Sequence, residues 1–116
     1  MIMEVKQIVD KVSEIMSNKK AIDIEVIDIK GITIIADYFI ICSGTSSTHV
    51  KGIADEIEFK LSDENNIHAK HIEGYESASW ILMDYGDFIV HVFHENEREF
   101  YSLERLWKDG NFEHRK

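Results

Sequence analysis

The segment Ser43-Gly44-Thr45-Ser46-Ser47 has the residue types of a phosphate-binding turn. It follows an apolar run and precedes a helical pattern, so its backbone N–H groups and the helix dipole could face an anion. The turn lacks the Gly-Lys-Ser/Thr ending of a P-loop and the second and third glycines of a dinucleotide-binding loop. The same residues can instead cap the helix, with Ser46 or a neighbour as the cap, and we favour this interpretation.

Two carboxylates at alternate positions of a strand could complete such a turn by holding Mg²⁺ for nucleotidyl transfer. Asp23 and Glu25 have this spacing, but they precede the turn, whereas nucleotidyltransferases have their pair after it. The strand expected after the second helix, His68 to Ile72, has no carboxylate. We therefore expect no enzyme, no metal and no cofactor. A nucleotide-binding or degenerate nucleotidyltransferase-like domain without catalysis remains the alternative function.

The histidines and the single cysteine do not predict a metal site or a nucleophile. His68 and His71 are three residues apart on predicted strands or strand ends, as are His91 and His94. An extended strand points such a pair to opposite faces, so satisfied or exposed histidines are expected. Cys42 lies in an apolar run without a histidine close in sequence, which predicts a buried structural thiol.

The residues best suited to binding a partner lie in two apolar runs that meet at Asp84-Tyr85-Gly86-Asp87. Gly86 can supply the positive φ of a tight turn, so the runs predict a β-hairpin. With Tyr85 and Gly86 as the two loop residues, Asp84 faces Asp87, residue 82 faces residue 89, and residue 80 faces residue 91.

Strand alternation sorts the side chains of this hairpin onto two faces. One face is wholly apolar and should be core: it carries Ile81, Met83, Phe88, Val90 and Val92. The other face carries Trp80, Leu82, Ile89, His91 and Phe93, and it ends at Asp84 and Asp87. A tryptophan, a histidine and two acids on an otherwise apolar face are compatible with a second buried layer. They are equally compatible with a surface that binds a partner.

The remaining pattern predicts the elements that position these residues. Apolar spacing predicts helices over about residues 3–18, from Ser47 onward and over about 97–107, and strands over about 22–29, 38–42 and 68–72. Gly31 turns the chain between the first two strands. Residues from Asp109 onward resemble a frayed tail. This order predicts an α/β fold with a mixed sheet of about five strands flanked by helices.

Composition limits the functional classes. The chain has 116 residues and no evident linker, which predicts one domain over 1–116. A formal net charge of −9 argues against a general nucleic-acid binder and suits a basic protein partner. No apolar run approaches the roughly 20 residues needed to cross a bilayer. We therefore expect no membrane contact, and the single cysteine, which cannot form an internal disulfide, fits the reducing cytoplasm.

Several spaced motifs resemble the ribosomal silencing factor (Iojap-like) family. They are Ala36 to Ser47, Glu73-Gly74, Trp80 to Asp84, Gly86-Asp87, Val90 to Phe93 and Tyr101 to Trp107. They occur in the family's order over about residues 20 to 107. The chain departs from the pattern at Thr48, where the family usually has a basic residue. It departs again at Ala78-Ser79, where the family usually has Gly-Asp.

The resemblance implies a nucleotidyltransferase-like sheet, no enzymatic activity, and a translational repressor that acts when nutrients are short. The partner would be the large ribosomal subunit, bound through its fourteenth protein at the face that the small subunit must cover. Joining of the subunits would then be blocked sterically, and the protein would be a homodimer off the ribosome. The expected partner-binding residues are Glu73, Trp80, Leu82, Asp84, Asp87, His91 and Tyr101.

Overall fold

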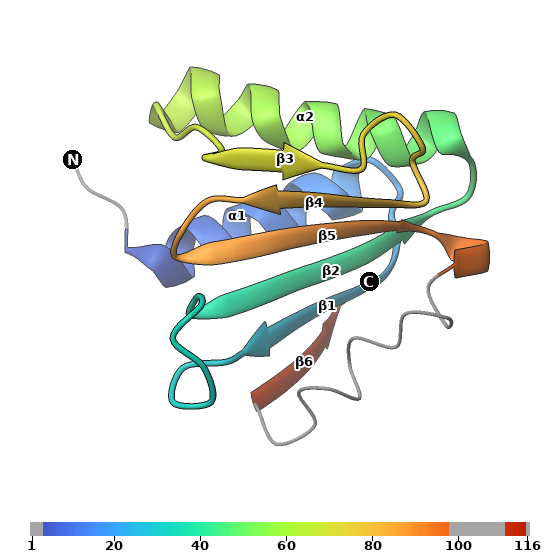
Figure 1. Ribbon diagram of the computed structural model, residues 1–116. Helices are drawn as coiled ribbons and strands as arrows, with labels where there is room; N and C mark the ends of the chain where they lie inside the picture. Colours follow the sequence, from blue (N-terminus) through green and yellow to red (C-terminus); the bar gives the residue numbers. More distant parts are fainter. Residues whose placement is uncertain (1–3, 98–110, 116) are drawn as a thin grey trace.

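The computed structural model describes residues 4–97 and 111–115 (Figure 1). Its elements are α1 (Val5–Asn18), β1 (Ile22–Asp28), β2 (Tyr38–Gly44), α2 (Ser47–Asn65), β3 (His71–Glu73), β4 (Trp80–Asp84), β5 (Phe88–His94) and β6 (Asn111–Arg115). Within the described residues, six strands form one sheet in the order β3-β4-β5-β2-β1-β6. The pair β2–β5 is parallel and the other pairs are antiparallel. The predicted mixed sheet with flanking helices is confirmed, while its nucleotidyltransferase likeness stays a prediction.

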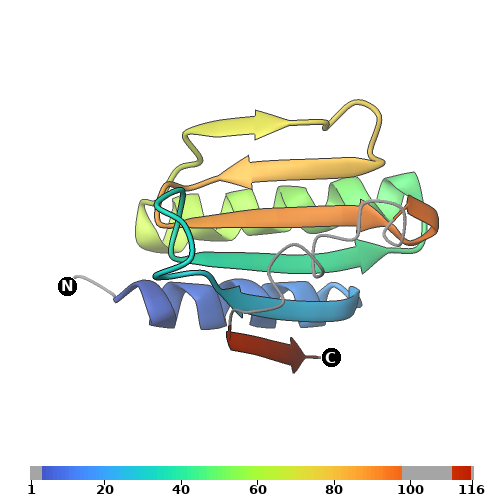
Figure 2. The same cartoon turned by 60° about the horizontal axis from the view of Figure 1, so that its bottom comes forward.

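Both helices lie against the same face of the sheet (Figures 1 and 2). The predicted apolar stripe of α1 is buried there, with Val9, Val12 and Met16 completely inaccessible. The helix begins at a capping box, in which Glu4 N–H donates to the side chain of Gln7 at 3.0 Å. The main core therefore lies between the helices and the inner face of the sheet, where it also takes in the apolar face predicted for the hairpin. Its members from the hairpin are Ile81, Met83, Phe88, Val90 and Val92.

The hairpin of β4 and β5 forms with a register two residues away from the predicted one. Trp80 faces Phe93, and Leu82 faces His91. Tyr85 N–H donates to the Phe88 carbonyl at 3.0 Å, so Gly86 and Asp87 are the loop residues and the predicted loop was wrong. Because a shift of two residues preserves the alternation, every side chain keeps the face that was predicted for it.

Residues 111–115, which were predicted to fray, form β6 instead. This strand pairs antiparallel with β1, from Asp28 opposite Asn111 to Ile24 opposite Arg115. The pairing provides hydrogen-bond partners for the backbone at the outer edge of β1. Because the two strands are far apart in the sequence, local composition does not reveal this pairing. The third strand is also shorter than predicted and starts at His71 rather than His68. The predicted final helix over about 97–107 lies outside the described residues except for Glu97.

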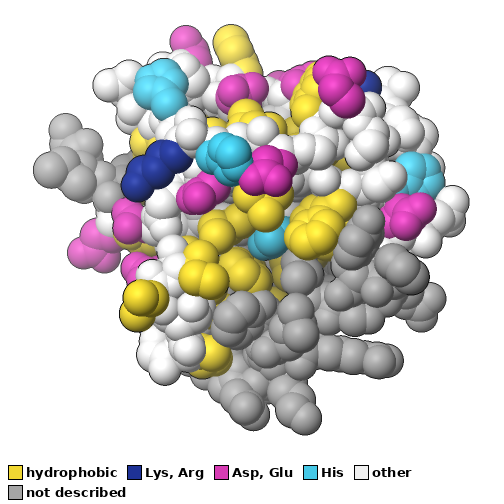
Figure 3. Space-filling model, viewed as in Figure 1, with side chains coloured by type: hydrophobic (Ala, Val, Ile, Leu, Met, Phe, Trp, Pro, Cys, Tyr) yellow, Lys and Arg dark blue, Asp and Glu magenta, His cyan; other side chains and the backbone are white. Residues whose placement is uncertain are grey.

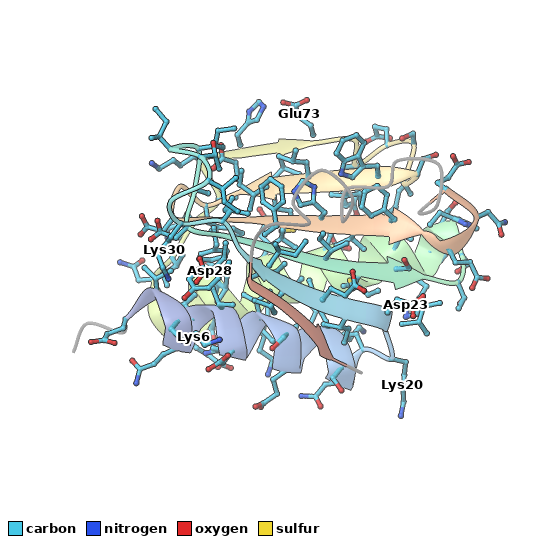
Figure 4. The ribbon with its side chains drawn as sticks, turned by 90° about the horizontal axis from the view of Figure 1, so that it is seen from below. Lys6, Lys20, Asp23, Asp28, Lys30 and Glu73 are labelled. Carbon is cyan, nitrogen blue, oxygen red and sulfur yellow. The ribbon has the colours of Figure 1, made fainter. Side chains whose placement is uncertain are left out.

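Helix α1 ends in a Schellman motif with Lys20 in the left-handed conformation, at φ 64. Lys20 N–H donates to the Ser17 carbonyl at 3.0 Å, and Ala21 N–H donates to the Met16 carbonyl at 3.0 Å. The Lys20 side chain is exposed and points away from the body of the protein (Figure 4).

We expect Lys20→Gly to raise the free energy of unfolding by about 0.5–1 kcal/mol, because glycine removes the left-handed penalty and loses no buried contact. Urea denaturation measures the change. The control is Lys19→Gly, since Lys19 has an ordinary φ of −91 and should gain nothing. An equal gain at both positions would contradict this explanation.

Tyr85 is buried on the helix side of the hairpin and stacks on Phe88, with the ring centroids 5.0 Å apart. Within the described part of the chain, its hydroxyl makes no hydrogen bond. Burial raises the pKa of Tyr85 to about 12, and the negative charge of Glu58 adds to the effect. Folding therefore favours the protonated phenol.

Since the folded pKa of Tyr85 exceeds that of an unfolded tyrosine, about 10, its contribution to stability is complete below pH 10. That contribution is lost as the pH rises from about 10 to about 12. We expect Tyr85→Phe to be as stable as the parent or about 1 kcal/mol more stable at pH 7, because a buried hydroxyl is removed. Between pH 10 and 12 the advantage of Tyr85→Phe should grow by about 2–3 kcal/mol. Urea unfolding at pH 7, 10, 11 and 12 tests this, and parallel pH profiles for the two proteins would contradict it.

Candidate functional site

Of the predicted binding residues, those on described strands are Glu73, Trp80, Leu82, Asp84 and His91, and they lie on the sheet face opposite α1 and α2, which we call the front face. Its hairpin residues are those predicted, and β1 and β2 extend it; the apolar members are Ile27, Phe39, Ile41, Trp80, Leu82, Ile89 and Phe93. Figure 3 shows hydrophobic side chains grouped on this face, with acidic and histidine side chains beside them. The front face therefore combines apolar and charged groups within one surface.

Strand pairing brings these residues together in rows, because directly opposed residues share a face. One row runs from Glu73 through Leu82 and His91 to Ile41. A neighbouring row runs from His71 through Asp84, Ile89 and Phe39 to Ile27. Each row starts with a polar residue at the β3 edge of the sheet and ends with an apolar residue on β2 or β1.

Trp80 and His91 are joined at the centre of the front face. The Trp80 indole N–H donates to His91 Nδ1 at 3.0 Å. An acceptor at Nδ1 fixes the neutral imidazole with its proton on Nε2. The Trp80 ring also stacks on Phe93 at 5.3 Å, and the Phe39 ring meets His91 edge-on at 4.7 Å. These contacts hold the tryptophan in one orientation, as a preorganised anchor requires.

Burial divides the front face into an inaccessible part and an accessible part. His91 is 3% exposed, and Ile89 and Phe93 are also buried. Trp80 and Leu82 on β4 are only half-buried. Part of this face is therefore buried, as a second buried layer would be, and part is accessible, as a binding surface would be; partner binding itself stays a prediction. The half-buried Trp80 and Leu82 are the members that a partner can reach.

The predicted acidic residues differ in their local roles. Glu73 and Asp87 are exposed, and the Glu73 carboxylate contacts the ring of His71. Figure 4 shows Glu73 pointing away from the helices. Asp84 is half-buried, and its Oδ1 accepts the Gly86 N–H at 2.8 Å, which stabilises the hairpin loop. The accessible acids are thus Glu73 and Asp87, which we call the acidic rim.

One predicted site residue is not described by the structure, and two residues of the front face were not predicted. Tyr101, the last predicted site residue, lies outside the described residues. Sequence reasoning did not include Phe39 and Ile41 in the site, although the continuous apolar run from Tyr38 to Cys42 predicted a strand covered on both faces. That run was the signal that β2 would extend the front face of the hairpin.

The turn before α2 serves as a helix cap, as predicted. Ser46 Oγ accepts the His49 N–H at 3.0 Å. The Thr45 N–H donates to His49 Nδ1 at 2.9 Å, and His49 Nε2 lies 2.7 Å from the Lys19 carbonyl. Ser46 Oγ and the Thr45 N–H are therefore engaged by groups of His49.

The upstream carboxylate pair does not keep regular strand geometry. Asp23 has a φ of 51, and the pairing of β1 is irregular between Ile22 and Glu25. A bulge of this kind disturbs the alternation on which a shared metal site on one strand face depends.

Cys42 is fully buried, which confirms the predicted structural thiol. His68, His71 and His94 make local contacts, as expected. His68 Nε2 lies 3.1 Å from Asn66 Oδ1, and His94 Nδ1 accepts the Asn96 N–H at 3.2 Å. Among the described residues, no helix has the length and apolar character of a membrane span.

Comparison with known proteins identifies the family. The family model described as "Ribosomal silencing factor during starvation" matches residues 2–116. Ribosomal silencing factor RsfS of Bacillus subtilis (strain 168) is 46% identical over 108 residues, which cover 93% of this chain and 91% of that protein. Mitochondrial assembly of ribosomal large subunit protein 1 of Mus musculus is 30% identical, over 90% of this chain and 47% of that protein.

A solved structure gives the same result for the fold. The crystal structure of a Chromobacterium violaceum protein superposes with a TM-score of 0.87 at 32% sequence identity, covering 91% of this chain and 88% of that one. The front face described above therefore lies on a fold that the relatives share. Because the family model spans nearly the whole sequence and the Bacillus relative is similar over nearly its whole length, this chain belongs to the ribosomal silencing factor family.

Proposed function

We propose that this chain is a translational repressor that binds the large ribosomal subunit through its fourteenth protein and blocks joining of the small subunit. Membership of the silencing factor family supports a regulatory, ribosome-related role. The name of the mouse relative links that protein to the large subunit. The observation that carries the proposal is the half-exposed Trp80, held in place by His91 beside an acidic rim.

The mechanism is occlusion, which needs neither a catalytic group nor a cofactor. Trp80 and Leu82 form an apolar anchor, the kind of residue that contributes most to protein interfaces. Glu73 and Asp87 face basic groups of the partner, and such rim charges mainly affect the association rate. A protein bound at the subunit interface excludes the other subunit by its volume alone. The proposal places the protein in the cytoplasm with the ribosome, as a homodimer when it is unbound.

Co-sedimentation with isolated large subunits tests the proposal, with small subunits added in a second step. We expect the protein to sediment with the large subunit and the joined-ribosome peak to decrease. If the protein binds but that peak does not decrease, the large subunit remains the partner and the occlusion mechanism is wrong. If no protein sediments with the large subunit, the proposed function is wrong.

The acidic rim should affect salt dependence more than affinity. We expect Asp87→Asn to weaken large-subunit binding by roughly threefold or less near physiological salt, and to reduce the loss of affinity when salt is raised. The dissociation constant at three salt concentrations measures both effects. Asp63→Asn is the matched control, because it removes the same charge from an exposed position on α2. The same salt response in both variants would show that Asp87 does not face the partner.

A further inference from the structure

The connection between β1 and β2 exposes three isoleucines. Ile32 and Ile35 are 41% and 61% exposed, and Ile34 is fully exposed. The segment Gly31–Ala36, which we call the isoleucine loop, has no charged residue. Phe59 on α2 is the one other large apolar side chain that is exposed within the described residues. Because soluble proteins rarely group exposed apolar side chains, such a group marks an interaction site.

The base of the isoleucine loop is fixed to the sheet. Ile29, two residues before the loop, and Ala36, its last residue, are buried. Ile29 N–H donates to the Asp37 carbonyl at 2.9 Å, and Ile32 N–H donates to the Ile29 carbonyl at 3.1 Å. Lys30 Nζ donates to the Tyr38 hydroxyl at 2.8 Å, beside the loop. A loop held in this way presents its side chains at a low cost in ordering entropy.

The isoleucine loop adjoins the proposed binding face. Figures 2 and 4 show it rising from the sheet on the side opposite α1, the side to which Glu73 points. Ile29 and Ala36 belong to the same buried cluster as Ile89 and Phe93, against which Trp80 packs. Asp37 N–H donates to the Asp87 carbonyl at 2.8 Å, which ties the loop to the β4–β5 turn. The loop therefore adjoins the front face at the end of the hairpin where Asp87 of the acidic rim lies.

We infer that the isoleucine loop is a second docking element of this surface, and that it inserts into an apolar recess flanked by basic groups on the same large-subunit protein. This inference rests on the proposed function. Charge favours that partner over a second copy of the chain. The formal net charge is −9, and the exposed Asp87 adjoins the loop. A symmetric contact at this loop would bring identical acidic residues together, whereas a basic surface would attract them.

The test is the double variant Ile34→Ser/Ile35→Ser in the full chain, assayed by co-sedimentation with isolated large subunits. We expect binding to weaken by about tenfold to a hundredfold, because two large apolar side chains are no longer buried at the interface. The loss should be similar at low and high salt, since an apolar contact is not screened. The matched control is Phe59→Ser, whose side chain is as exposed as Ile35, at 61%, but lies on α2 behind the sheet. It should bind like the parent.

The outcomes separate the two proposals. If the parent and Phe59→Ser bind and the double variant binds weakly, the loop is a docking element. If all three bind equally well, the inference is wrong and the proposed function stands. If the parent itself does not bind, the proposed function fails and the inference fails with it. Light scattering gives a further result: a double variant that loses only self-association, with unchanged subunit binding, would assign the loop to a dimer contact and overturn the inference.

Discussion

Trp80→Ala should weaken binding to the large ribosomal subunit at least tenfold, the largest effect on affinity expected for a single substitution. Anchoring tryptophans of protein interfaces typically cost about 2 kcal/mol or more when truncated. Trp80 fits this role because its half-buried side chain is already held in one orientation before a partner binds. His91 accepts its N–H at 3.0 Å, and Phe93 stacks on it at 5.3 Å. Little entropy is then lost when the ring is buried by a partner.

The same contacts predict a moderate loss of stability in Trp80→Ala. Truncation removes the stacking on Phe93 and leaves His91 Nδ1 without the donor it has in the parent. We expect a cost of about 1–3 kcal/mol in unfolding free energy, from lost burial and an unpaired acceptor. Binding must therefore be measured well below the unfolding transition, with the folded fraction of each protein checked by circular dichroism.

Two further variants separate anchoring from stability. Ile81→Ala alters the adjacent residue, which is fully buried on the helix side, and should cost about 2–5 kcal/mol in stability. Its folded fraction should bind like the parent, because the front face is unchanged. Trp80→Phe retains an aromatic ring without the N–H donor and should bind with intermediate affinity. If Trp80→Ala binds as well as the parent, or if it does not fold, the anchor lies elsewhere on the surface.

Periodicity was sufficient to predict the helices of the described part and the two faces of the hairpin. The alternation in β4 and β5 placed Ile81 and Val92 inside, and Trp80 and His91 outside the main core. The structure confirms this arrangement. The prediction is robust because the face to which a side chain points depends only on whether its position along the strand is odd or even. Any register that differs by two residues gives the same faces, so the candidate site was recognised despite the wrong loop.

The register itself depends on a contact that the spacing of residues does not show. Both Tyr85-Gly86 and Gly86-Asp87 contain a glycine that can adopt positive φ, and the chain uses the second pair. The Asp84 carboxylate accepts the Gly86 N–H at 2.8 Å, and this bond favours the observed loop. Such a side-chain contact becomes clear only when the backbone conformation is known.

Other features were missed because non-local packing imposes them. Ala78 has a φ of 56 and is buried, at a position where the family usually has glycine. Alanine has no local preference for this conformation, so the surrounding structure must enforce it. The strand β6 likewise depends on pairing with β1, more than 80 residues earlier in the chain. Local sequence patterns do not contain this information.

Gly74→Ala should destabilise the protein strongly, by about 3 kcal/mol or more. Gly74 has a φ of +81, which costs a residue with a Cβ about 1–2 kcal/mol. A Cβ there would also lie 2.0 Å from the Trp80 carbonyl oxygen and 3.1 Å from its carbonyl carbon. These are backbone atoms at the start of β4, so the clash cannot be relieved by rotating a side chain.

The control for the conformational part of this effect is Gly31→Ala. Gly31 has nearly the same φ, +84, but a Cβ added to it would meet no atom within 4 Å. We expect Gly31→Ala to cost only about 1–2 kcal/mol, so that the difference between the variants measures the clash with Trp80. Urea denaturation gives both values, and equal losses would show that the clash is relieved at no cost. Since relief requires the backbone of Trp80 to move, Gly74→Ala should also weaken large-subunit binding, whereas Ile81→Ala should not. The β3–β4 turn would then be a positioning element for the anchor, acting through the backbone alone.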